Sequence, residues 1–122
     1  MRDLTFITKK PLELEKCLEQ IKTIFKGAKG NGHNIYIGKS LKSLYIWFPS
    51  IKKYDPSEYW DEEELKNLPE DFKYFTSVEF HLTSVSKQVV KALESLYPEM
   101  IVEDENGNFY SITKYLDTTF EY

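Results

Sequence analysis

Two amphipathic segments separated by strand-like segments constrain the fold of this chain more than any other feature. The first spans residues 11–25: Pro11 suits the first position of a helix and Gly27 a stop. The second begins at Ser84 or Ser86 and stops before Pro98. Each carries one apolar stripe, formed by Leu14, Cys17, Leu18, Ile21, Ile24 and Phe25 in the first and by Val85, Val89, Leu93, Leu96 and Tyr97 in the second. Helices with a single stripe are most simply buried side by side on one face of a mainly antiparallel sheet.

The segments between and around these helices have the composition of strands. Aromatic and β-branched residues concentrate in residues 4–7, 35–37, 44–48, 72–82, 100–105 and 108–112. Asn106-Gly107 predicts a two-residue hairpin turn, and Asp55 with Pro56 predicts a short helix over 56–68. The resulting order, β-α-β-β-(α)-β-α-β-β, predicts an α+β fold, a variant of the ferredoxin-like sandwich. Its outer sheet face would carry Tyr45, Trp47 and Phe75.

Length and composition indicate one folded domain over residues 1–122. Hydrophobic residues make up 41% of the chain, enough to support a core. The lone Cys17 cannot form an internal disulfide, which favours a reducing compartment. No run approaches the roughly 20 apolar residues of a membrane span, and no secretory signal opens the chain. We therefore expect a cytoplasmic protein with no membrane contact.

The net charge of −4 argues against a general nucleic-acid binder, because phosphate contacts come mainly from Lys and Arg. The charge is uneven along the chain: residues 1–53 carry +7 and residues 54–122 carry −11. This asymmetry suggests a charged partner. The alternative is that the two halves interleave in space and produce a mixed surface.

An acidic and aromatic segment is the candidate partner-binding surface. Its members are Tyr54, Glu58, Tyr59, Trp60, Asp61, Glu62, Glu63 and Glu64. Aromatic side chains supply buried anchors at interfaces, and clustered carboxylates attract a basic partner. The alternative is a solvated helix start, where acidic residues are favoured by the helix dipole.

The motifs that suggest catalysis have simpler explanations. Gly38-Lys39-Ser40 lacks the first glycine of a phosphate loop, and the glycines at 27–32 follow a helix end, where they connect elements. Cys17 lies on an apolar stripe and is expected in the core. His81, on one strand face with Glu79, could act as a general base, but a structural histidine is the simpler interpretation. We expect no enzymatic activity, no cofactor and no metal site.

Residues 89–111 resemble a known group of proteins. Leu96-Tyr97-Pro98 at the end of a helix, followed by an acidic hairpin over residues 101–111, is similar to the closing helix and hairpin of small bacterial toxin-immunity proteins. The resemblance implies a protein that binds and neutralises a cognate toxin, often a basic nuclease. The alternative is a small-molecule-binding or regulatory ferredoxin-like domain that acts as a homodimer.

Overall fold

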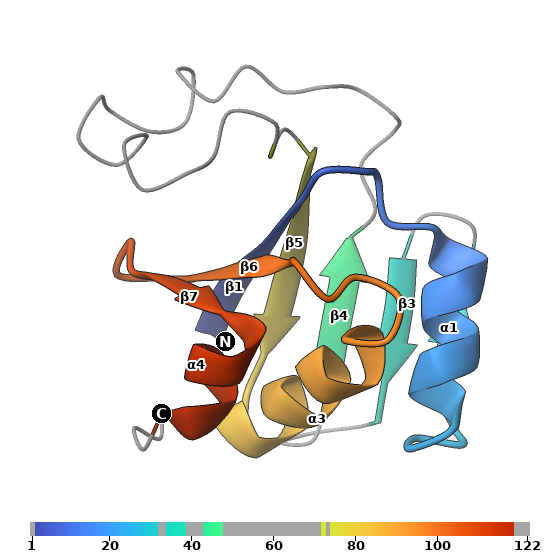
Figure 1. Cartoon of the computed structure of the whole chain (residues 1–122). Helices are drawn as coiled ribbons and strands as arrows, with labels where there is room; N and C mark the ends of the chain where they lie inside the picture. The colour runs from blue at the N-terminus through green and yellow to red at the C-terminus, as the bar shows by residue number, and fades with distance from the viewer. Residues whose placement is uncertain (1, 32–33, 39–42, 48–71, 73, 119–122) are drawn as a thin grey trace.

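A computed structural model describes residues 2–31, 34–38, 43–47, 72 and 74–118 (Figure 1). Three helices and seven strands are formed by these residues. In chain order they are β1 (Arg2–Thr8), α1 (Leu14–Lys22), β2 (Lys29–Gly30), β3 (Asn34–Ile37), β4 (Leu44–Trp47), β5 (Tyr74–Phe80), α3 (Thr83–Leu93), β6 (Ile101–Asp104), β7 (Phe109–Ser111) and α4 (Ile112–Asp117). The predicted helix over 56–68 lies outside the described residues.

One sheet organises the molecule, with the strand order β2-β3-β4-β5-β1-β6-β7. Every pairing between the described strands is antiparallel. Figure 1 shows the helices on the viewer's side of the sheet. The α+β prediction with a mainly antiparallel sheet is therefore confirmed.

The ferredoxin-like arrangement is not confirmed, because the sheet has seven strands and a third helix covers it. The extra helix, α4, was not predicted, although Ser111 caps it by accepting a hydrogen bond from the Lys114 amide (3.2 Å). A serine cap is a local signal of a helix start.

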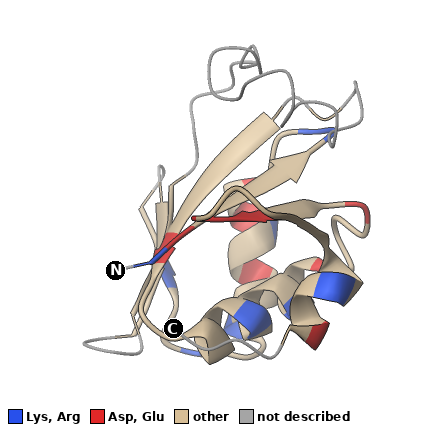
Figure 2. Cartoon of the chain, turned by 90° about the vertical axis from the view of Figure 1, so that its left-hand side faces the viewer, with Lys and Arg blue, Asp and Glu red and all other residues tan. Residues whose placement is uncertain are grey.

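Strand β1 lies in the interior of the sheet and joins the two halves of the sequence. It pairs with β5 on one side and β6 on the other, so Leu4 lies opposite both Val78 and Asp104. The positively charged first half and the negatively charged second half thus interleave. In Figure 2, acidic and basic positions occur on both the strands and the helices. The described residues favour the mixed-surface alternative.

The core lies between the helices and the sheet. Alternate strand residues point into it, as period-two alternation requires. Its largest fully buried side chains are Tyr115, Phe6, Phe80, Ile21, Ile35, Leu44, Ile46, Leu93 and Met100. Alternation along residues 72–82 predicts a half-buried strand with Tyr74, Thr76, Val78, Phe80 and Leu82 on one face. Of these, Thr76, Val78 and Phe80 are buried in the core.

Both predicted helices are shorter than the sequence pattern suggested. Helix α1 begins at Leu14 instead of Pro11. The residue just before it, Glu13, donates its amide hydrogen to the Tyr97 hydroxyl (2.9 Å). It ends at Lys22, which leaves Ile24 43% exposed beyond the stripe. Helix α3 begins at Thr83, before either predicted serine.

Ser86 is inside α3, where its hydroxyl donates to the Thr83 carbonyl and pairs with the Tyr115 hydroxyl, each at 2.7 Å. It is therefore a buried link between α3 and α4 rather than a cap. Polar groups buried in this way keep their hydrogen bonds within the protein.

The β6–β7 hairpin has a three-residue loop, so the predicted two-residue turn is wrong. The Asp104 amide donates to the Asn108 carbonyl, and the Gly107 amide donates to the Asp104 carbonyl. Gly107 has a φ of 82°, the left-handed conformation that closes a three-residue hairpin. Glu105, Asn106 and Gly107 form the loop.

The glycine-rich connection after α1 contains the edge strand β2. Lys29 and Gly30 pair with Tyr36 and Ile35 of β3. A side chain at position 30 would lie 3.0–3.1 Å from the Leu14 and Leu18 methyl carbons, so glycine lets α1 pack directly against this strand. The prediction of a plain connector was therefore incomplete.

Candidate functional site

The predicted partner-binding segment cannot be placed. All eight of its residues, Tyr54, Glu58, Tyr59, Trp60, Asp61, Glu62, Glu63 and Glu64, lie outside the described part of the chain. In sequence the segment falls between Trp47, the last residue of β4, and Phe72, just before β5. The candidate site described below is built from the sheet itself.

The outer face of the sheet, opposite the helices, carries an accessible surface that we call the aromatic–acidic face. It consists of Tyr36, Tyr45, Trp47, Glu79 and Asp3. The register places four of these in one row across four strands, since Tyr36 lies opposite Tyr45, Tyr45 opposite Glu79 and Glu79 opposite Asp3. Directly opposite residues share a face of the sheet and have Cβ atoms about 5 Å apart.

The three aromatic rings form a continuous platform. The rings of Tyr36 and Tyr45 have centroids 6.1 Å apart, and those of Tyr45 and Trp47 are stacked with centroids 6.3 Å apart. Trp47 is 45% exposed, whereas most tryptophans in folded proteins are largely buried. The expectation that Tyr45 and Trp47 lie on the outer face is confirmed.

Phe75 also lies on this face, but it is buried in a small cluster with Ile7 and Phe72. The outer face therefore has two ends with different properties. One end is apolar and closed, and the other presents aromatic rings beside carboxylates.

Two carboxylates complete the accessible end. Asp3 is exposed and Glu79 is partly exposed, and they lie directly opposite each other on β1 and β5. Like charges in this relation repel and destabilise a strand pair. Within the described residues, neither carboxylate makes an ion pair or a hydrogen bond that would offset the repulsion.

Asn34 borders the same surface. It lies opposite Trp47 at the neighbouring strand position and is only 8% exposed. Its Oδ1 atom is buried and has no hydrogen-bond partner in the described structure. A buried polar atom without a partner is uncommon and destabilising.

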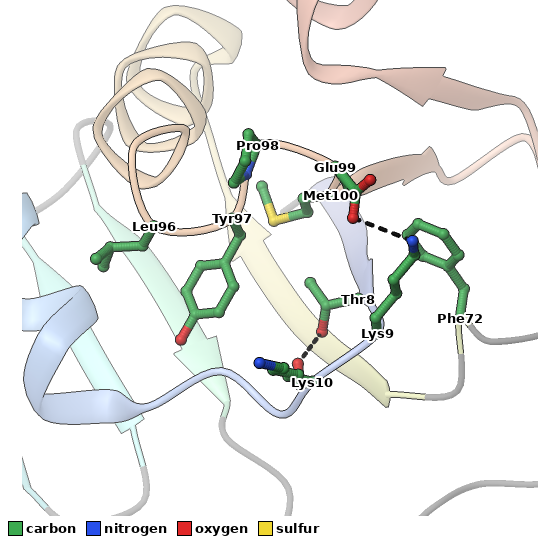
Figure 3. A pocket seen from close by; sticks show the side chains of 9 residues that line it. All are labelled: Thr8, Lys9, Lys10, Phe72, Leu96, Tyr97, Pro98, Glu99 and Met100. Carbon is green, nitrogen blue, oxygen red and sulfur yellow. Dashed lines mark hydrogen bonds and ion pairs between the residues drawn. The ribbon is translucent and has the colours of Figure 1, made fainter.

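A small pocket lies elsewhere, between the end of β1 and the turn after α3 (Figure 3). Its volume is about 230 Å³. Lys9 spans its rim, with the ammonium 3.1 Å from a Glu99 carboxylate oxygen and 5.4 Å from the Phe72 ring centroid. Thr8 donates to the Lys10 carbonyl at 2.6 Å. The pocket is smaller than the ~300–1,000 Å³ typical of ligand sites, so it fits a small ligand or a single side chain.

Cys17 is a core residue, as predicted. It is fully buried, and this burial raises the pKa of its thiol to about 12, although a hydrogen bond with Tyr97 opposes the shift. Burial also raises the pKa of the Tyr97 phenol. A thiol with so high a pKa is protonated at neutral pH and is a poor nucleophile.

His81 does not have the strand environment predicted for it. Strand β5 ends at Phe80, and Thr83 is a buried residue of α3, so Glu79, His81 and Thr83 do not share a strand face. His33 lies outside the described residues. Among those described, no group of three or more His, Cys, Asp or Glu residues could hold a metal ion. Nor does any helix in the described part of the chain have the length and apolarity needed to cross a membrane.

Asp104 organises the β6–β7 hairpin. One of its carboxylate oxygens accepts hydrogen bonds from the amides of Asn106 and Asn108, each at 2.9 Å. The other accepts from the Asn108 side chain (3.2 Å) and the Tyr110 hydroxyl (3.1 Å). Both Asp104 carboxylate oxygens are therefore occupied by hydrogen bonds within the hairpin. The resemblance at residues 101–111 thus covers a turn that is stabilised by its own residues.

No family model, curated protein or solved structure matches the chain. The similarity to toxin-immunity proteins therefore stays a prediction.

Proposed function

We propose that this chain is a non-enzymatic protein-binding module that binds and neutralises a basic toxin, as immunity and antitoxin-like proteins do. The aromatic–acidic face is the observation that carries the proposal. Aromatic residues contribute most of the binding energy at many interfaces, and complementary charge accelerates encounter with a partner. A sheet holds such residues in fixed positions, which lowers the entropy lost on binding.

The sequence supports the same partner chemistry. The segment with Tyr54, Glu58, Tyr59 and Trp60 and the four acids that follow it lies between Trp47 and Phe72 in the chain. Carboxylates and aromatic rings recur in both places. A basic protein is the partner that suits both.

The second candidate is a regulatory domain that binds a small molecule. The pocket beside Lys9 favours it, and the four central strands, β4-β5-β1-β6, connected through α1 and α3, support a ferredoxin-like core with added edges. Edge-to-edge dimerisation has less support, because the edge strands β2 and β7 have two and three residues. Short edges offer few free backbone groups for pairing. A shift in melting temperature with a panel of small carboxylic acids would favour this candidate.

Affinity capture tests the main proposal. The tagged protein is incubated with lysate of its native cells at low and high salt, and bound proteins are identified by mass spectrometry. We expect one stoichiometric basic protein whose binding weakens at high salt. Expression of that protein alone should arrest growth, and co-expression with this chain should restore it.

The variants separate specific binding from general charge effects. Replacing Asp61, Glu62, Glu63 and Glu64 by Lys should abolish capture and growth rescue, whereas Glu15→Lys with Glu19→Lys on the exposed side of α1 should not. Capture of no stoichiometric partner, or of one that has no effect on growth, would contradict the proposal. An acidic partner would contradict its electrostatic basis.

A further inference from the structure

We propose that the aromatic–acidic face binds the guanidinium group of an arginine side chain presented by the basic partner. The inference deepens the proposed function and rests on it for the source of the arginine. It assigns chemistry to a surface of five residues, Tyr36, Tyr45, Trp47, Glu79 and Asp3.

The spacing of these residues suits a planar cation. A guanidinium stacks on tryptophan and tyrosine rings and at the same time donates a fork of hydrogen bonds to a carboxylate. Tyr45 stacks against Trp47 on its own strand and lies opposite Glu79 on β5. One guanidinium placed over Tyr45 therefore meets a ring platform and a carboxylate together.

The charges of the face have no internal counterpart. Asp3 and Glu79 lie opposite each other, and no described residue forms an ion pair with either. A bound cation would offset their mutual repulsion, because it attracts both carboxylates. In the free protein the carboxylates of Asp3 and Glu79 repel each other, and a cation bound between them would be attracted by both.

Asn34 gives a second, independent indication that a donor is missing here. Asn34 lies opposite Trp47 in the strand register, and its Oδ1 atom is buried without a hydrogen-bond partner. Arginine has five N–H donors and no acceptor. A donor-rich group seated beside Trp47 has the kind of N–H that this oxygen lacks.

Charge distinguishes this ligand from single-stranded nucleic acid. Aromatic rings on a sheet also stack with bases, but such sites surround the rings with positive charge that follows the phosphate backbone. Here the charged groups that follow the rings along the row toward β1 are the carboxylates of Glu79 and Asp3, which repel phosphates. Lys29, opposite Tyr36 at the edge of the sheet, is the one cation that the register places in this row of described residues.

Titration followed by NMR tests the inference on the intact protein. The probe is the peptide acetyl-Gly-Arg-Gly-Arg-Gly-amide, compared with a peptide in which citrulline, a neutral isostere, replaces both arginines. We expect the arginine peptide to shift the indole N–H signal of Trp47 and the amide signals of Tyr45 and Glu79. The citrulline peptide should bind at least about tenfold more weakly, which corresponds to ~1.4 kcal/mol.

Three variants locate the binding. Trp47→Leu and Glu79→Gln should each weaken arginine-peptide binding about tenfold, and Glu19→Gln, a carboxylate removed from the surface of α1, should leave it within about twofold. Glu79→Gln alters one partly exposed charge, so it keeps the test decisive if Trp47→Leu folds poorly. Circular dichroism melting checks the fold of each variant.

Equal binding of the two peptides, signal shifts away from the face, or unchanged affinity in Glu79→Gln would overturn the inference. Binding of a thymidine dodecamer at these signals in place of the peptide would also overturn it and indicate a nucleic-acid surface. Capture from lysate gives a separate result. Peptide binding at the face without a captured toxin would contradict the proposed function alone.

Discussion

Negative charge serves different purposes in two regions of this molecule. In the β6–β7 hairpin, the buried Asp104 carboxylate accepts four hydrogen bonds from Asn106, Asn108 and Tyr110. On the outer face, Asp3 and Glu79 lie opposite each other and gain nothing comparable from the described residues. The Asp104 carboxylate stabilises the fold, whereas the carboxylates of Asp3 and Glu79 are available to a partner.

The difference shows that acidity alone does not mark a binding surface. Residues 103–105 form an acidic triplet in the sequence, yet Glu103 and Asp104 are both buried, and Glu105 pairs with Arg2 at 2.5 Å. The carboxylates of the outer face are far apart in sequence and become neighbours only through strand pairing. Hydrogen-bond satisfaction distinguishes structural charges from charges that can bind.

The largest expected effect concerns the thiol of Cys17, which is fully buried. Alkylation by iodoacetamide at pH 8 should be at least roughly a thousandfold slower in the native protein than in urea, because reaction requires unfolding. Rapid labelling of the folded protein would show that the core is open at Tyr97.

The raised pKa of Cys17 also predicts a pH dependence of stability. The native thiol stays protonated up to a pKa of about 12, while the unfolded chain loses the proton above the ordinary value of 9.0. The free energy of unfolding should therefore fall as the pH rises from about 9 toward 12. Cys17→Ala should lack this contribution, as compared by urea denaturation at pH 8 and pH 10.5.

Replacing Asp104 should be the most destabilising change among the acidic residues. Asp104→Ala leaves four donors without their acceptor, and we expect the free energy of unfolding to fall by about 3 kcal/mol. Asp104→Asn, which keeps one acceptor oxygen, should cost about half as much. Urea denaturation measures both. A loss below about 0.5 kcal/mol for Asp104→Ala would remove the distinction between the two acidic regions.

Replacing Asp3 should have the smallest effect and the opposite sign. Asp3→Asn removes the like-charge contact with Glu79, so the free energy of unfolding should rise by about 0.3 kcal/mol at low salt. Added salt should reduce the gain, since the site is exposed to solvent. Destabilisation at both salt concentrations would show that Asp3 has a structural role.

The sequence predicted the elements of this fold better than their limits. Hydrophobic periodicity located α1, α3 and the inward face of β5, because burial against a sheet imposes those periods. The limits were displaced by tertiary contacts that a local pattern does not contain, such as the bond from Glu13 to Tyr97 and the burial of Ser86 against Tyr115. The hairpin was located correctly, but Asp104 and Gly107 impose a loop one residue longer.

The candidate site was predicted only in part. Alternation along β4 predicts that Tyr45 and Trp47 lie on the outer face, and this prediction needs no knowledge of how the strands pair. The sequence indicates Glu79 only as a neighbour of His81, and it gives no signal that Asp3 belongs to the same surface. Their adjacency depends on the pairing of β1 with β5, strands far apart in the chain, and register between distant strands is not encoded in either strand alone.

The interior position of β1, between β5 and β6, has a consequence for the folding of this chain. Leu4 cannot complete its pairings until Val78 and Asp104 are both present, and β5 and β6 are connected only through α3. A chain extending no further than α1 and the β3–β4 pair would hold β1 as an unpaired, apolar strand, which is prone to associate with other chains. During synthesis, β1 cannot pair with β5 and β6 until most of the polypeptide has been made. Folding should therefore be slow, because it depends on contacts between residues far apart in the chain.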